Sequence, residues 1–211
     1  DEVQSLSLWI KTEKSMQERL IEIAQTNQQR AHEIIQELNL IPLWASINVE
    51  AHLVGSLRMG LLMKHLDIDL HLYSDPVSLA DDFRIIARLA QKPHIKRIEY
   101  VNLLDTEEAC LEWHLHYEDP LNQMWQIDMI HILKGSQYDG YFEQMADRIV
   151  AVLTDETRHT ILQLKYETPE SEKIMGIEYY QAVLRDGVKN YVEFETWRRQ
   201  HPITGIITWM P

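Results

Sequence analysis

The sequence has little cysteine, glycine or proline, and fewer basic than acidic residues. Its single cysteine, Cys110, cannot form a disulfide within the chain. Such usage is typical of a reducing compartment, so we expect the protein in the cytoplasm. Seven glycines and seven prolines among 211 residues, with 45% hydrophobic and 25% charged residues, exclude a fibrous or disordered chain. The composition predicts an ordinary globular protein.

Positive charge and long apolar runs are also scarce. Lys and Arg number 20 against 33 Asp and Glu, a formal net charge of −13. Such a field repels polyanions, so we expect no binding of duplex nucleic acid. The most apolar region, about residues 38–49, is interrupted by Asn39, Pro42 and Ser46. It falls short of the roughly 18 to 20 apolar residues that cross a bilayer, and we expect no membrane association.

The spacing of apolar residues predicts a mixed architecture. Residues 6–38 have the period of a long amphipathic helix, with Thr26 and Asn27 as the expected break. Short runs rich in β-formers follow, and they predict strands at Ala45–Val54, Ile68–Tyr73, Ile95–Leu104, Cys110–Tyr117 and Met124–Leu133. A helix over Pro76–Gln91 separates the second strand from the third, which indicates a crossover in a mixed sheet.

Helical patterns return after Gly135. They predict helices at Tyr141–Leu153, Glu156–Tyr166, Ser171–Leu184 and Val188–Arg199. We therefore expect an α+β fold, with a mixed sheet of about five strands, an N-terminal helix and a C-terminal helical bundle. The expected divisions are an amphipathic helix over 1–40, a central sheet domain over 41–135 and a helical subdomain over 136–211.

Two acidic residues share one face of the second predicted strand. Alternate side chains of a strand point the same way, so Asp67 and Asp69 lie about 7 Å apart on one surface. Oxygen ligands of this kind hold Mg²⁺ together with substrate phosphates. A third acid, Asp128, lies within the apolar run of residues 125–130, where an unpartnered carboxylate would be unfavourable. The alternative is that these acids are solvated ends or edges of strands.

A candidate anion site precedes the acids. Gly55 and Ser56 end one strand and begin a short helix, so backbone N–H groups, the Ser56 hydroxyl and the helix dipole can face a phosphate. Arg58 and Lys64 lie on or near this helix and could neutralise further phosphate charge. Ser56 could also be only a helix cap, and the two basic residues only surface charges.

The motif Gly55-Ser56, ten intervening residues, Asp67-Ile68-Asp69 and the later Asp128 resembles the DNA polymerase β superfamily of nucleotidyltransferases. The resemblance covers about residues 47–132. The small template-free branch with an appended helical bundle is most similar; it includes antibiotic-modifying enzymes and minimal nucleotidyltransferases paired with HEPN toxins. One departure is Leu66, where many members have a small polar residue.

The resemblance implies the roles of these residues. Asp67 and Asp69 would bind two Mg²⁺ ions, and Asp128 would join them at the catalytic metal. Gly55 and Ser56 would hold the β and γ phosphates of a nucleoside triphosphate, with Arg58 and Lys64 as further cofactor-binding residues. The implied catalytic domain of residues 41–135 would move a nucleoside monophosphate, AMP from ATP being the expected case. The acceptor would be a hydroxyl of a small molecule or a protein, and pyrophosphate would be released.

Other functions remain open at this point. The chain could be a non-catalytic, antitoxin-like module that keeps the nucleotidyltransferase fold and docks a partner, or a hydrolase that uses the same metals. The helical segments have apolar faces that could also form a homodimer.

Several other side chains could take part in chemistry. A zinc site at His114 and His116 is disfavoured because no cysteine pair or His-Glu-x-x-His motif accompanies them. His71 could orient a substrate, and Lys165 could reach a phosphate. The aromatic residues of the C-terminal part favour helix packing over base stacking. They are Tyr179, Tyr180, Tyr191, Phe194 and Trp197.

Overall fold

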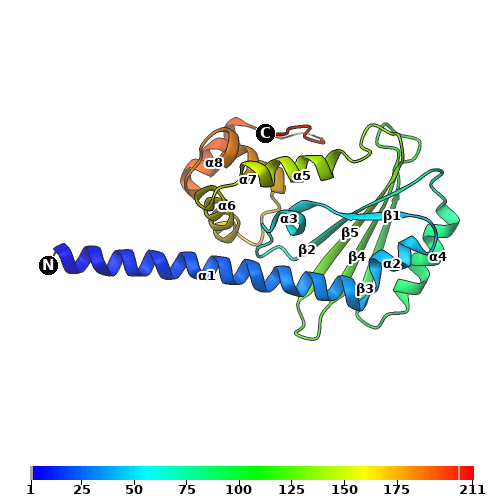
Figure 1. Ribbon diagram of the computed structural model, residues 1–211, viewed down its shortest axis with the longest axis horizontal. Coiled ribbons are helices and arrows are strands. Elements are labelled where there is room, and N and C mark those ends of the chain that lie inside the picture. Colours follow the sequence, from blue (N-terminus) through cyan, green and yellow to red (C-terminus); the bar gives the residue numbers. More distant parts are fainter. Residues whose placement is uncertain (1, 204) are drawn as a thin grey trace.

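A five-stranded mixed sheet forms the centre of the computed structural model (Figure 1), which describes residues 2–203 and 205–211, and side chains from residue 16 onward. The strands are β1 (Glu50–Leu53), β2 (Asp67–Ser74), β3 (Ile95–Asn102), β4 (Cys110–Glu118) and β5 (Met124–Leu133). Their order is β1-β2-β5-β4-β3; β2 and β5 are parallel, and the other neighbours are antiparallel. The predicted α+β fold with a five-stranded mixed sheet is confirmed.

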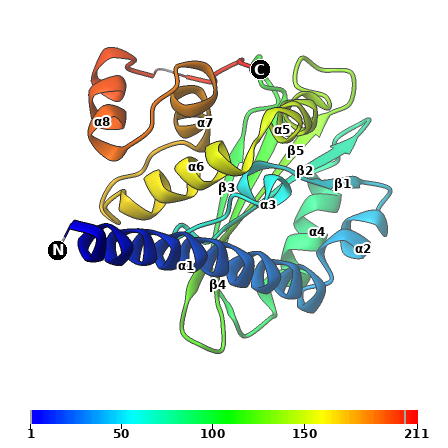
Figure 2. The ribbon, with the colours of Figure 1, turned by 60° about the vertical axis from the view of Figure 1, so that its left-hand side comes forward.

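The helices lie at both ends of the chain and in two connections of the sheet. They are α1 (Glu2–Glu37), α2 (Leu40–Ala45), α3 (Gly55–Met59), α4 (Leu79–Ala90), α5 (Tyr141–Val152), α6 (Asp155–Glu167), α7 (Gly176–Tyr180), the π-helical turn η1 (Gln181–Arg185) and α8 (Tyr191–Gln200). In both ribbon views α6, α7 and α8 gather beside the sheet, and α1 passes along both parts (Figures 1 and 2). No helix in the described residues is long and apolar enough to cross a membrane.

The two faces of the sheet differ in polarity. Alternation along β5 buries Trp125, Ile127 and Met129 and leaves the intervening residues partly exposed. The buried face packs on the end of α1, on α2 and on α4 in one apolar core. A second core joins the C-terminal helices to α1 and to the segment after α3. The opposite face carries a polar row across four strands, namely Asp69, Asp128, His114 and Glu99.

The apolar face contains one buried polar network. Asp82 of α4 is fully buried and accepts hydrogen bonds from Trp113 Nε1 at 3.0 Å and from His131 Nδ1 at 2.9 Å. The other ring nitrogen of His131 lies 2.8 Å from Ser74 Oγ. Because these four residues come from different elements, the network ties α4 to β2, β4 and β5.

Three predicted elements differ from the structure. The strand expected over 45–54 is limited to β1, because Leu40, Leu43 and Trp44 are buried at helical spacing in α2. The helix expected over 171–184 begins only at Gly176. The expected break in the first helix is absent: α1 is continuous through Asn27, whose side chain donates to Met63 O at 2.8 Å.

Candidate active site

Three aspartates lie together on the polar face of the sheet. Parallel pairing of β2 with β5 places Asp69 directly beside Asp128, and Asp67 beside Gln126. Gly55 lies against this group with φ +63°, and a Cβ atom there would lie 2.1 Å from Asp69 Oδ2. Only glycine suits both the left-handed backbone and this close approach. The turn before α3 is therefore fitted to the Asp69 carboxylate.

Burial and mutual repulsion raise the pKa values of two of these carboxylates. Burial is the main cause that raises the pKa of Asp69 to about 7, and the charges of Asp67 and Asp128 add to it. Burial, with a smaller contribution from Asp128, also raises the pKa of Asp67. Neighbouring carboxylates of this kind could hold a divalent cation, which would neutralise them, and hard oxygen donors fit Mg²⁺. In the described residues the three acids are adjacent, but their carboxylate oxygens do not all lie within 4.8 Å of one another.

His114 of β4 is the partner of the third aspartate. Its Nδ1 lies 2.6 Å from Asp128 Oδ1, and its Nε2 lies 3.3 Å from Glu112 Oε2. The hydrogen bond to Asp128 is the main cause that raises the pKa of His114 to about 9. Gln126 Nε2 also donates to both carboxylate oxygens of Asp128, at 3.0 Å each. The sequence could not reveal the His114 contact, because it depends on the register of β4 against β5.

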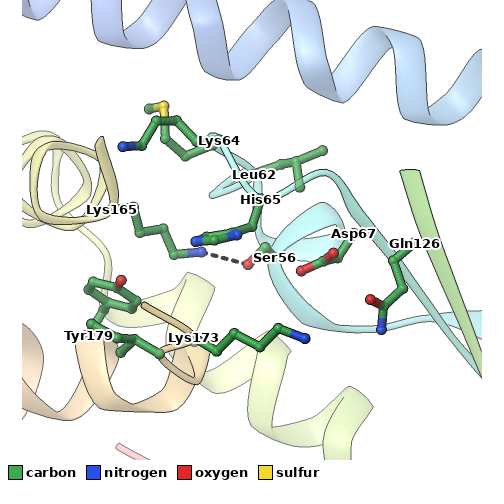
Figure 3. A pocket seen from close by; sticks show the side chains of 12 residues that line it. Ser56, Leu62, Lys64, His65, Asp67, Gln126, Lys165, Lys173 and Tyr179 are labelled. Atoms are coloured by element: carbon green, nitrogen blue, oxygen red, sulfur yellow. Dashed lines mark hydrogen bonds between the residues drawn. The ribbon is translucent and has the colours of Figure 1, made fainter. Parts of the chain in front are cut away.

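Lys165 joins the C-terminal helices to the predicted anion site. Its ammonium donates to Ser56 Oγ at 2.6 Å and to Leu61 O at 3.0 Å (Figure 3). The Tyr180 hydroxyl lies 3.1 Å from Ser56 Oγ. Ser56 is thus contacted from α6 and α7, and it does not cap the helix, because Val54 occupies the N-cap position of α3 and no side chain caps it.

A cavity of about 230 Å³ separates this lysine from Asp67. We call it the lysine cavity, because Lys64, Lys165 and Lys173 are among the residues that line it. Figure 3 shows the Lys173 side chain extending from the side of Tyr179 toward Asp67 and Gln126. Lys173 had no recognisable signal in the sequence. It lies on the non-helical segment before α7, and only the packing of that segment brings it to the cavity.

The two basic residues predicted to bind phosphate have different positions. Lys64 lines the lysine cavity, and its ammonium donates to Thr168 O at 2.7 Å. Arg58 is not brought to this cavity. Its guanidinium donates to both carboxylate oxygens of Asp147, at 2.8 and 3.0 Å, and to Leu53 O at 3.1 Å. Arg58 therefore fastens α3 to α5 in this structure.

The aromatic residues divide in a similar way. Tyr179 lines the lysine cavity and also stacks on Phe194, with ring centroids 4.8 Å apart. Phe194 in turn stacks on Trp197 at 6.2 Å. Phe194 thus packs α8 against α7 and Trp197 stacks on it within α8, while Tyr179 both packs and faces the cavity.

Comparisons with known proteins identify the fold. No protein-family model and no curated protein matches the sequence. Among solved structures, the chain is similar to the Cid1 poly(U) polymerase bound to MgGTP, with TM-score 0.55 and 15% identity over 81% of this chain and 55% of that chain. It is also similar to the non-canonical poly(A) polymerase complex GLD-2–GLD-3, with TM-score 0.52 and 11% identity over 88% of this chain and 63% of that chain.

A cytoplasmic RNA terminal U-transferase gives TM-score 0.51 and 15% identity over 81% of this chain and 53% of that chain. The chain thus spans between about half and two thirds of the length of these polymerases. The matched structures are nucleotidyltransferases, as the sequence motif predicts. This chain therefore shares its fold with these polymerases.

Proposed function

We propose that this protein is a Mg²⁺-dependent nucleotidyltransferase, which moves a nucleoside monophosphate from a nucleoside triphosphate to a hydroxyl group. One observation carries the proposal: Lys165, Lys173 and Ser56 line a single cavity with Asp67, beside Asp69 and Asp128. Positive groups on one wall suit a triphosphate, and carboxylates on the other suit its metal ions. The fold, which is shared with nucleotidyltransferases, supports this assignment.

The side chains have separate tasks in the proposed reaction. Lys165 and Lys173 bind the phosphates that leave, and Ser56 orients them. Asp67, Asp69 and Asp128 would hold two Mg²⁺ ions, which supply charge neutralisation at the reacting phosphate. The acceptor oxygen forms a bond to the α-phosphorus, the bond from that phosphorus to the pyrophosphate oxygen breaks, and the acceptor proton passes to the Asp128 carboxylate. Positioning and electrostatics account for most of the rate.

Fewer observations bear on the identity of the donor and of the acceptor. Solved relatives of the fold are bound to MgGTP and MgATP, which supports a magnesium nucleotide as donor. We propose ATP as that donor. We propose a small molecule or a protein as acceptor, since the chain has a formal charge of −13.

Thermal unfolding with each of the four nucleoside triphosphates, with and without Mg²⁺, tests the proposal. A ligand that binds the native state raises the melting temperature, so one nucleotide should do so only with Mg²⁺. Asp67→Asn should abolish this shift, whereas Asp105→Asn, at an exposed position in the β3–β4 connection, should keep it. Absence of any shift at millimolar nucleotide would contradict the proposal and favour the partner-binding alternative.

A further inference from the structure

A second cavity opens on the other side of Asp67. Its volume is about 650 Å³, and it shares Lys64, His65, Asp67 and Gln126 with the lysine cavity. The tip of the β4–β5 hairpin supplies Asn122, Gln123 and Met124, and the remaining lining residues are Leu66, His116 and Glu170. We call it the hairpin cavity. The two cavities are contiguous at the first aspartate of the site.

The hairpin tip is held in place by a buried carboxylate. Asp119 Oδ1 accepts hydrogen bonds from the backbone N–H groups of Leu121 at 2.8 Å and Gln123 at 2.9 Å. Asn122 has a left-handed backbone, with φ 60°, and its N–H donates to Asp119 O at 2.9 Å. Within the described residues, the side-chain amides of Asn122 and Gln123 make no hydrogen bond, and both residues are exposed. The fold therefore presents two unpartnered amides on a fixed turn.

The charges of the two cavities differ. Of the described residues that line the hairpin cavity, Lys64 alone is Lys or Arg, and its ammonium already donates to Thr168 O. Glu170 and Asp67 contribute negative charge. Single-stranded nucleic acid is bound by grooves with positive charge along its backbone and by aromatic stacking platforms. This lining of amides, imidazoles and carboxylates suits hydroxyl groups rather than a polyphosphate chain.

In-line chemistry determines which cavity receives the acceptor. The attacking oxygen enters opposite the leaving group, and the lysine cavity is where the proposed function places the pyrophosphate. We propose that the hairpin cavity binds the acceptor, which is an uncharged compound with several hydroxyl groups, and that Asn122 and Gln123 hydrogen-bond to it. The inference rests on the proposed function. It separates this chain from the matched polymerases, which are named for poly(U) and poly(A).

Nuclear magnetic resonance of the side-chain amides tests this binding directly. The ¹⁵N-labelled chain is saturated with the Mg²⁺–nucleotide that stabilises it, and is then titrated separately with myo-inositol, sorbitol and oligoadenylate. The variants Asn122→Gly and Gln123→Ala identify the two amide signals by their loss. Glycine suits the left-handed backbone of residue 122, so removal of that amide need not disturb the turn.

We expect at least one polyol to move both amide signals and oligoadenylate to leave them unchanged. In the double variant the affinity for that polyol should fall about tenfold, as expected for two lost neutral hydrogen bonds. Gln144→Ala, at an exposed position on α5, should leave the affinity unchanged. Movement of these signals by oligoadenylate, or by none of the probes, would overturn the inference. Failure of every nucleotide to bind in the preceding step would instead overturn the proposed function.

Discussion

Buried and partly buried carboxylates on the two faces of the sheet have opposite surroundings. On the apolar face, Asp82 is fully buried but accepts hydrogen bonds from His131 and Trp113. On the polar face, Asp69 has two further carboxylates as neighbours, and burial with their charge raises its pKa to about 7. A satisfied acid stabilises the fold, whereas crowded acids need a cation from outside. The difference separates a structural carboxylate from a candidate metal ligand in the same domain.

The largest effect that this comparison predicts is on activity at Asp69. Asp69→Asn should lower nucleotidyl transfer by about a thousandfold or more, because the variant removes a charge that the proposed function assigns to metal binding. Its stability at neutral pH should be unchanged or higher, since the ionised carboxylate is unfavourable beside Asp67 and Asp128. Transfer assays with labelled nucleotide and thermal unfolding measure the two quantities. A strongly destabilised variant would show that Asp69 has a structural role like that of Asp82.

The reverse outcome is expected for Asp82. Asp82→Asn should lower the free energy of unfolding by about 2 to 4 kcal/mol, because it breaks a buried network. Urea unfolding gives this value. Nucleotide binding per folded molecule should stay at the wild-type level. A loss of nucleotide affinity in the folded variant would mean that the two faces are coupled.

Two basic residues sharpen the comparison within the candidate site. Lys165→Ala should weaken nucleotide binding about ten- to a hundredfold, because its ammonium faces the lysine cavity. Arg58→Ala should leave nucleotide affinity unchanged and reduce stability by at most about 1 kcal/mol, because the Asp147 side chain is largely exposed. Calorimetric titration of both variants decides this. Equal losses of affinity would place Arg58 in the phosphate site after all.

The smallest effect concerns acid stability at the rim of the apolar face. Glu37 accepts hydrogen bonds from Arg30 at 2.7 Å and from Tyr117 at 2.8 Å, and the Arg30 contact is the main cause that lowers its pKa. A lowered native pKa stabilises the fold above the unfolded value of about 4.3, and this contribution is lost as the pH falls below it. The free energy of unfolding of Glu37→Gln should therefore fall less steeply than that of the wild type as the pH is lowered from about 5 to 3. If the variant and the wild type unfold alike in acid, the ion pair of Glu37 with Arg30 is fully screened by solvent and contributes no stability.

Much of the fold could be predicted, because the spacing of apolar residues along the chain reflects which side chains are buried. The strands at β2, β4 and β5 alternate clearly, and their predicted positions differ from the structure by no more than one residue at either end. The segment before β1 was misassigned as strand, since a short apolar run is ambiguous between helix and strand. The start of α7 was also misplaced, because the extended segment before it is held by tertiary contacts and has no breaker of its own.

The sequence by itself determined the three acids and the Gly-Ser turn of the candidate site. Strand alternation put Asp67 and Asp69 on one face, and the motif spacing pointed to Gly55, Ser56 and Asp128. Tertiary structure decided the partners of these residues: His114 at Asp128, Lys165 and Lys173 opposite Asp67, and Asp147 at Arg58. The physical reason is the separation along the sequence over which each kind of interaction acts. Alternation and capping act between near neighbours in the chain, whereas strand register and helix docking join residues that are far apart in the sequence.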